Sequence, residues 1–244
     1  MRLSKAWLIA SKDLRIFRTK RNVLYSAAFI PFILAVGLPL LIRFISSRPN
    51  VTASILENFL NAFSFFFVIL SAITPTAIAS YSLVGEKVQK SLEPLLAAPI
   101  TDSELLAGKA MASFIPTIVP IYLAAIIFMV LADIFSHGML DYYYYPNWTI
   151  ALIMLLLVPL AVIFSIGLNV LISSRVNDVR TAQMYGYFSV LPLAAVYLLT
   201  EIQVLKLDTG TLWIIAGILL IINLILFPAS ARTFQREKIL TEWR

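Results

Sequence analysis

The chain has 244 residues, of which 60% are hydrophobic and 13% charged, and it contains no cysteine. So apolar a composition cannot be dissolved as one compact globule, and the lack of cysteine excludes thiol catalysis and cysteine-ligated metal sites. The net charge is +6, and the sequence contains no Lys or Arg tract with interleaved aromatic residues. We therefore expect the basic residues to contact anionic lipid head groups and not nucleic acid.

The N-terminal region has the pattern of an amphipathic helix over about residues 3–18. Its apolar side chains fall within about a 100° arc at 3.6 residues per turn, whereas most of its basic residues lie elsewhere. The arc comprises Leu3, Ala6, Trp7, Ala10, Leu14 and Phe17. We expect an elbow helix lying along the membrane surface. The alternative is an ordinary basic flank of the first span.

Six uncharged apolar stretches fill most of the chain, and all 32 Asp, Glu, Lys and Arg residues lie between or outside them. A helix of roughly 20 apolar residues crosses about 30 Å of hydrocarbon, so each stretch can span a bilayer. We therefore expect an all-α membrane protein with a single transmembrane domain over residues 1–244. The predicted spans are residues 23–42, 58–85, 110–132, 148–173, 181–200 and 212–227.

The basic residues predict the orientation, because Lys and Arg near helix ends tend to stay in the cytoplasm. Seven precede residue 23, three lie in residues 86–109, two in residues 174–180, and four follow Phe227. The intervening loops contain only Arg43, Arg48 and Lys206. This asymmetry predicts a multi-pass protein of the cell membrane with both termini in the cytoplasm.

The loop between the second and third spans carries the most local signals. Glu86 and Lys90 form a favourable i, i+4 pair, and Thr101 with Glu104 predicts a capping box at the start of the third span. Between them the segment is apolar on too many sides to prefer water, so we expect a partner or the bilayer surface to cover it. Its apolar residues are Leu92, Leu95, Leu96, Ala97, Ala98 and Ile100.

Other polar features allow two interpretations each. The run from Tyr142 to Tyr145 favours an interfacial aromatic belt, with substrate stacking as the alternative. Lone polar residues within spans usually turn away from lipid and could line a translocation path or join helices by hydrogen bonds. The candidates for a translocation face are Asn61, Ser64, Asn169 and Asn223.

Several kinds of chemistry have no matching residues. His137 is the single histidine, so two-histidine metal sites and histidine relays are excluded and no metal site is expected. The spans contain no ionisable Asp, Glu, Lys or Arg, which weakens an ion-coupled carrier. No phosphate loop is present, because Gly108 and Lys109 are followed by Ala110. Energy for uphill transport would have to come from another polypeptide.

Three stretches resemble the membrane subunits of type-2 ABC transporters, in the archaeal and bacterial branch of that family. Gly85-Glu86-Lys87, Lys90 to Ile100 and Glu104 to Lys109 resemble the loop after the second span. Ser173 to Gln183 resembles the loop between spans four and five, and Phe234 to Leu240 resembles the C-terminal tail.

The resemblance implies a permease that catalyses nothing itself, pairs with a second permease copy, as a homodimer or a related heterodimer, and docks ATP-binding subunits, which would hold ATP and Mg. It also implies export and a coupling helix over about residues 86–98. The ATPase-coupling residues would be Glu86, Lys87, Lys90, Ser91, Leu92, Glu93, Pro94, Leu95 and Leu96. The alternatives are a membrane anchoring or assembly subunit that transports nothing and an ion-coupled secondary carrier.

Overall fold

The computed structural model describes residues 3–19, 21–49, 51–88, 101–202 and 204–233, and all regular structure among them is helical. The helices are α1 (Leu3–Thr19), α2 (Arg21–Ser46), α3 (Ala53–Val88), α5 (Asp102–Leu140), α6 (Trp148–Leu152), α7 (Val158–Arg175), α8 (Val179–Gly186), α9 (Val190–Glu201) and α10 (Thr209–Thr233). A π-helical turn, η1 (Ile153–Leu157), joins α6 to α7, and a 3-10 turn, η2 (Tyr187–Ser189), joins α8 to α9.

Six helical segments are long and apolar enough to cross a membrane, which confirms the predicted fold class and number of spans. The helices extend beyond the predicted spans, most clearly α5, which was expected over residues 110–132 and runs from Asp102 to Leu140. The reason is local. Thr101 caps its start, and the helix continues until Asp141 adopts the left-handed conformation with φ 58°.

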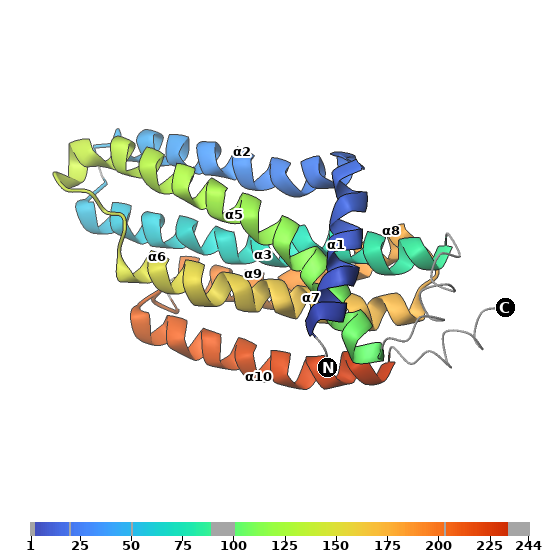
Figure 1. The fold of residues 1–244 in the computed structure, drawn as a ribbon. Coiled ribbons are helices and arrows are strands. Elements are labelled where there is room, and N and C mark those ends of the chain that lie inside the picture. Colours follow the sequence, from blue (N-terminus) through green and yellow to red (C-terminus); the bar gives the residue numbers. More distant parts are fainter. Residues whose placement is uncertain (1–2, 20, 50, 89–100, 203, 234–244) are drawn as a thin grey trace.

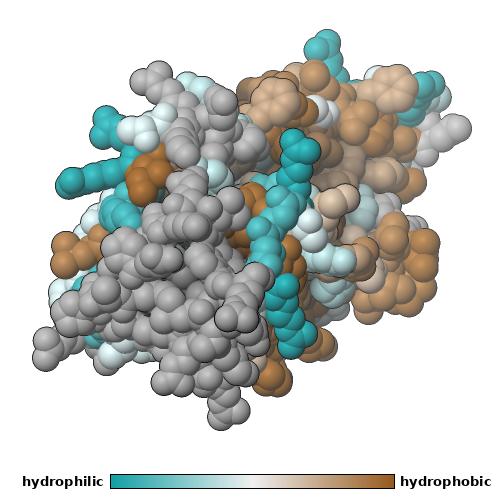
Figure 2. All heavy atoms as spheres, turned by 90° about the vertical axis from the view of Figure 1, so that its right-hand side faces the viewer, coloured by the Kyte–Doolittle hydropathy of each residue, from teal (hydrophilic) through white to brown (hydrophobic). Residues whose placement is uncertain are grey.

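The long helices form a bundle with two ends (Figure 1). At the end called here the N-terminal end, α1 lies across the bundle, α3 and α10 finish, α5 begins, and α7 turns into α8. The α2–α3, α5–α6 and α9–α10 connections lie at the opposite end. Figure 2 faces the N-terminal end and shows hydrophilic residues beside the grey atoms, with hydrophobic residues along one adjoining flank.

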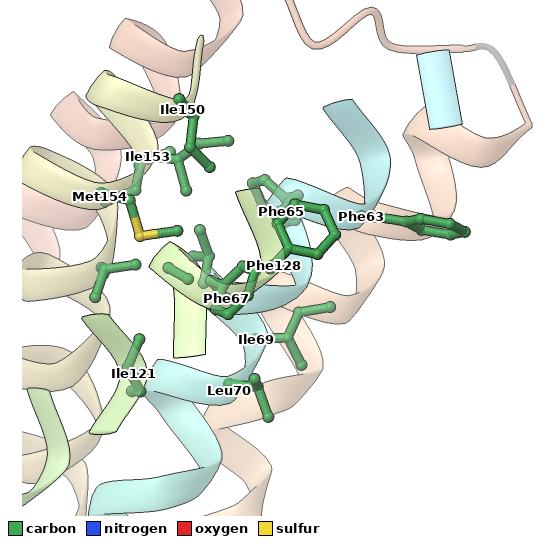
Figure 3. Packing of buried hydrophobic residues seen from close by; sticks show 14 of the residues in the cluster. Phe63, Phe65, Phe67, Ile69, Leu70, Ile121, Phe128, Ile150, Ile153 and Met154 are labelled. Carbon is green, nitrogen blue, oxygen red and sulfur yellow. The ribbon is translucent and has the colours of Figure 1, made fainter. Parts of the chain in front are cut away.

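The central helix is α3. Of the most apolar stretch of its membrane-length segment, 83% is buried inside the protein. The corresponding share in the other five membrane-length segments is 22–56%. Phe67 of α3 packs edge-on against Phe128 of α5 with ring centroids 5.3 Å apart. Figure 3 shows these rings with Ile153 and Met154 of η1 in the core. The chain therefore wraps its other spans around α3.

The outer faces of the bundle remain apolar. Phe29 and Ile33 of α2 are exposed, as are Ile214 and Leu224 of α10. Contiguous apolar surface of this kind is typical of helices that contact lipid or another membrane subunit. The exposed faces thus agree with a multi-pass membrane protein.

The bundle covers a face of α1 that only partly coincides with its apolar arc. Ala6, Ala10 and Phe17 of that arc are buried against the protein, together with Asp13, whereas Trp7 of the arc is 53% exposed. The cause is tertiary, because α1 packs against α5 in addition to any contact with lipid. The buried face includes the single acidic residue of α1.

Candidate functional site

The predicted coupling segment, about residues 86–98, follows α3 and precedes α5 in the sequence. The end of α3 and the start of α5 both lie at the N-terminal end of the bundle (Figure 1). Glu86 and Lys87 belong to the last turn of α3, which ends at Val88. The remaining coupling residues lie outside the described residues, namely Lys90, Ser91, Leu92, Glu93, Pro94, Leu95 and Leu96. We call the end of α3 and the start of α5, which flank residues 89–100, the two stems of that segment. Both stems lie at the N-terminal end of the bundle.

The stem on the α5 side has the capping box that the sequence predicts. The Glu104 backbone N–H donates to Thr101 Oγ1 at 3.3 Å, and the Thr101 N–H donates to Glu104 Oε2 at 3.1 Å. These bonds satisfy donors that would otherwise be left without partners at a helix start. The beginning of α5 is therefore well defined at Asp102.

The backbone of helix α1 lies very close to the backbone of α5 near its start. A Cβ atom placed on Gly108 of α5 would lie 2.7 Å from Ile9 Cβ and 2.8 Å from the carbonyl oxygen of Ala6. Real Cβ atoms do not approach so closely, so only glycine fits at this position without a shift of either helix. The close approach brings the next residue of α5, Lys109, beside the buried face of α1.

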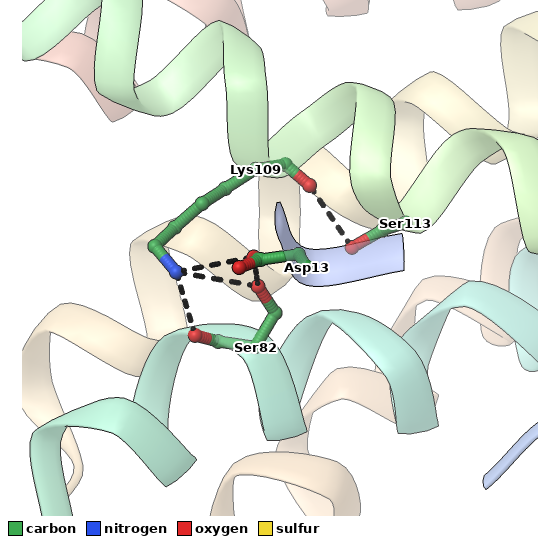
Figure 4. A network of polar contacts seen from close by, with 4 residues as sticks. All are labelled: Asp13, Ser82, Lys109 and Ser113. Atoms are coloured by element: carbon green, nitrogen blue, oxygen red, sulfur yellow. Dashed lines mark hydrogen bonds and ion pairs between the residues drawn. The ribbon is translucent and has the colours of Figure 1, made fainter. Parts of the chain in front are cut away.

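A buried polar triad joins three helices at this point (Figure 4). Lys109 Nζ of α5 lies 3.4 Å from Asp13 Oδ2 of α1 and donates to the Ser82 carbonyl of α3 at 2.9 Å. Ser82 Oγ donates to the same Asp13 oxygen at 2.8 Å. Both charged side chains are almost wholly buried, Lys109 at 1% and Asp13 at 4% exposure. An ion pair of this kind needs good geometry to offset its desolvation.

A second polar cluster lies deeper in the bundle, between α3, α7 and η2. Asn169 of α7 donates to Thr76 Oγ1 at 3.2 Å and accepts from Ser80 Oγ at 3.2 Å. The hydroxyls of Thr76, Ser165 and Ser189 all donate to the carbonyl of Ala72, at 2.6–3.3 Å. Two of these hydroxyls come from outside α3, Ser165 from α7 and Ser189 from η2. The Ala72 carbonyl is therefore a point at which α7 and η2 attach to α3.

At the opposite end, three tyrosines of the α5–α6 connection attach to two adjacent turns of α3. Tyr142 donates to Glu57 Oε1 at 2.6 Å, Tyr144 donates to Asn61 Oδ1 at 2.8 Å, and Tyr145 donates to the Leu60 carbonyl at 2.8 Å. Burial raises the pKa of Tyr144 to about 12 and that of Tyr145 well above its usual range. These tyrosines attach the α5–α6 connection to α3. Neither the aromatic-belt interpretation nor the substrate-stacking interpretation of the sequence anticipated this role.

All four candidates for a translocation face form hydrogen bonds with other parts of the chain. Asn61 and Ser64 bond to tyrosines of the α5–α6 connection, and Asn169 belongs to the deeper cluster. Asn223 of α10 donates to the Leu160 carbonyl of α7 at 2.9 Å. The structure brings Asn169 together with Thr76 and Ser80, and it separates Asn61 and Ser64 from them along α3. These bonds are helix-to-helix or helix-to-loop contacts, and a role in translocation stays a prediction.

Sequence reasoning did not single out Asp13, Ser82 or Lys109. One signal was available, since Asp13 is the only acidic residue among the seven basic ones that precede residue 23. Its position on the apolar side of α1 marks it as a candidate for a buried partner. Among the described residues, no group of three or more His, Cys, Asp and Glu side chains could hold a metal ion.

The comparison with protein families agrees with this architecture. Residues 7–225 match a family model described as ABC-2 family transporter protein. The matched range runs from α1 through five of the six membrane-length segments and ends inside the sixth, in α10. A comparison with curated proteins found no match.

Proposed function

The chain belongs to the ABC-2 transporter family, and from that premise we propose that this permease exports its substrate using energy from a separate ATP-binding subunit. The observation that carries the proposal is the family match over residues 7–225, which covers five of the six membrane-length segments completely and most of the sixth. The absence of a phosphate loop from the sequence supports a division of labour in which ATP and Mg bind to the partner and this chain catalyses nothing.

The proposed orientation has the N-terminal end of the bundle in the cytoplasm. The four segments that hold most of the basic residues are residues 1–22, 86–109, 174–180 and those after Phe227. In the described parts of these segments, Lys12, Arg15, Arg175 and Arg180 all belong to helices or turns of that end. The charge asymmetry and the architecture therefore support the same orientation in a cell membrane.

The proposed docking site for the ATP-binding subunit is the segment between α3 and α5. Its apolar side chains need cover, and its two stems lie at the end of the bundle proposed to face the cytoplasm. A second permease copy is the proposed partner within the membrane, where the exposed apolar faces of the spans could contact it. Together these partners give a complex of two permeases and two ATP-binding subunits.

Co-purification tests the proposed function directly. The tagged chain is expressed in its native membranes and solubilised, and proteins that bind it are identified by mass spectrometry. We expect a phosphate-loop ATPase whose ATP hydrolysis in proteoliposomes rises with a transported compound from a panel of lipids, drugs and glycans. Recovery of no such ATPase would overturn the proposal and favour an ion-coupled carrier. An ATPase that binds but drives no transport would identify an anchoring subunit.

The predicted translocation face can be tested in the same proteoliposomes. Leu replaces Asn61, Ser64, Asn169 or Asn223 one at a time, and transport is compared with substrate-stimulated ATP hydrolysis. Loss of stimulation in correctly folded variants would support a place on the path. If all four variants transport normally, the path lies elsewhere and these residues serve only to join helices.

A further inference from the structure

The buried triad of Asp13, Ser82 and Lys109 connects three segments that are far apart in the sequence. One oxygen, Asp13 Oδ2, accepts from Ser82 Oγ at 2.8 Å and lies 3.4 Å from Lys109 Nζ. Lys109 also donates to the Ser82 carbonyl, which makes the contact between α3 and α5 direct. The N-terminal helix and both stems of residues 89–100 are therefore joined at a single point (Figure 4).

Stability alone is a poor reason for this arrangement. A buried ion pair stabilises a fold less than apolar side chains of the same volume, because both charges lose their hydration. The second carboxylate oxygen, Asp13 Oδ1, is buried and has no hydrogen-bond partner among the described residues, which adds to the cost. What the triad provides is directionality, since hydrogen bonds fix the relative rotation and register of three helices in a way that apolar contacts do not.

Apolar packing around the triad makes the attachment of α1 stiff. On one side, Ile9 packs with Leu105 and Leu106 of α5. On the other, Phe17 packs with Ala27 of α2 and Ile78 of α3. The close approach at Gly108 sets the distance between α1 and α5. A displacement of either stem would consequently move α1 and the start of α2.

We propose that Asp13, Ser82 and Lys109 are positioning residues that lock α1 and the two stems of residues 89–100 into one rigid body. Movement imposed on that segment by an ATP-binding subunit then reaches α1, in addition to α3 and α5. This inference rests on the proposed function, since it assumes that the subunit docks on residues 89–100. It adds the N-terminal helix to the elements that move.

Pulsed electron paramagnetic resonance can test the lock, because the chain has no native cysteine to compete for spin labels. Labels at Arg15 on α1 and at Ser103 in the first turn of α5 report their separation, and a third position at Ser47 provides a reference at the opposite end. The key variant is Asp13→Asn with Lys109→Met, which removes both charges together and leaves no lone buried charge. Ser82→Ala is a milder variant that keeps the ion pair. Asp141→Asn and Lys206→Met, both exposed at the opposite end, are matched controls.

In the wild-type chain we expect one narrow Arg15–Ser103 distance distribution that the controls leave unchanged. The double variant should lose this narrow distribution while still inserting and running as a folded protein on size exclusion, and Ser82→Ala should broaden it partly. An unchanged distribution in the double variant would overturn the lock. If the double variant fails to fold, Ser82→Ala decides, and an unchanged distribution there would overturn the lock equally.

The second measurement uses the co-purified ATP-binding subunit, trapped with ATP and vanadate. We expect the Ser47–Arg15 and Ser47–Ser103 distances to shift together in the wild-type complex, whereas in the variants Arg15 no longer follows Ser103. A wild-type Arg15 that stays in place while Ser103 moves would overturn the inference. Absence of any shift at Ser103 would instead count against docking on residues 89–100, and the narrow distribution in the isolated permease would separate that failure from failure of the lock.

Discussion

The hydroxyl oxygens of Ser64 and Tyr145 lie 2.7 Å apart, although the residues are 81 positions apart in the sequence. Ser64 also donates to the Leu60 carbonyl, the same oxygen that accepts from Tyr145. The contact fixes the α5–α6 connection to α3 inside the protein, where Ser64 is fully buried. It is the innermost of the three tyrosine contacts on α3.

Tyr145→Phe should lower the free energy of unfolding by about 1 kcal/mol, because the buried Leu60 carbonyl and the Ser64 hydroxyl lose a partner while the ring remains. Thermal unfolding of the detergent-solubilised chain measures the change. Tyr143→Phe is the matched control, since that ring is 70% exposed and stacks on His137. Equal melting temperatures for the two variants would contradict the prediction.

Gly108→Ala should destabilise the chain, by more than about 1 kcal/mol, because the new methyl group would meet the Ile9 side chain and the Ala6 carbonyl of α1. Gly138→Ala lies in the same helix, α5, with nothing within 4 Å of its added Cβ. It should be neutral or raise stability by up to about 1 kcal/mol, since alanine favours the helix. Thermal melts of the two variants make the comparison, and a tolerated Gly108→Ala would mean that α1 is not packed as described.

Alkaline titration should reveal the raised pKa of Tyr144. Burial raises the pKa of Tyr144 to about 12, above the usual value of about 10. The protonated ring therefore contributes its full stability below about pH 10, and this contribution is lost as the pH rises toward 12. Absorbance at the phenolate band, with Tyr144→Phe for subtraction, measures the ionisation. A Tyr144 signal that titrates near pH 10 would show that this ring is not buried in solution.

The proposed orientation predicts which introduced cysteines a membrane-impermeant maleimide reaches in intact cells. Cysteines at Ser47, Asp141 and Thr209, all exposed at the opposite end of the bundle, should react. Cysteines at Ser91 and Ser174 should react only after the membrane is opened. The reverse pattern would place the N-terminal end outside the cytoplasm and overturn the assignment from charge.

The docking proposal predicts that Leu92→Ala with Leu95→Ala releases the ATP-binding subunit. Truncating a well-buried leucine anchor costs on the order of 2 kcal/mol, roughly thirtyfold in affinity. The matched control is Leu40→Ala with Leu41→Ala, because both leucines are exposed on the outer face of α2. Pull-down of the ATPase by the two double variants is the measurement, and equal recovery would remove residues 89–100 as the docking site.

Sequence alone determined the features that depend on local composition. Six apolar stretches suffice to predict six spans, because the backbone of a membrane-crossing segment must satisfy its own hydrogen bonds as a helix. The capping box of Thr101 and Glu104 was equally predictable, since its partners are three residues apart. A helix, α1, covers the N-terminal residues for which the sequence predicts one, whereas its place along the membrane surface stays a prediction.

Tertiary structure decided which polar side chains meet. Asp13 and Lys109 are 96 positions apart, and although the position of Asp13 on α1 hints at a buried partner, no periodicity could identify Lys109 of α5 as that partner. The same is true of Asn169, whose partners lie on α3 more than 80 positions earlier. Apolar patterning sets which face of a helix avoids water, but in a membrane lipid and protein satisfy that face equally, so only packing selects the neighbour.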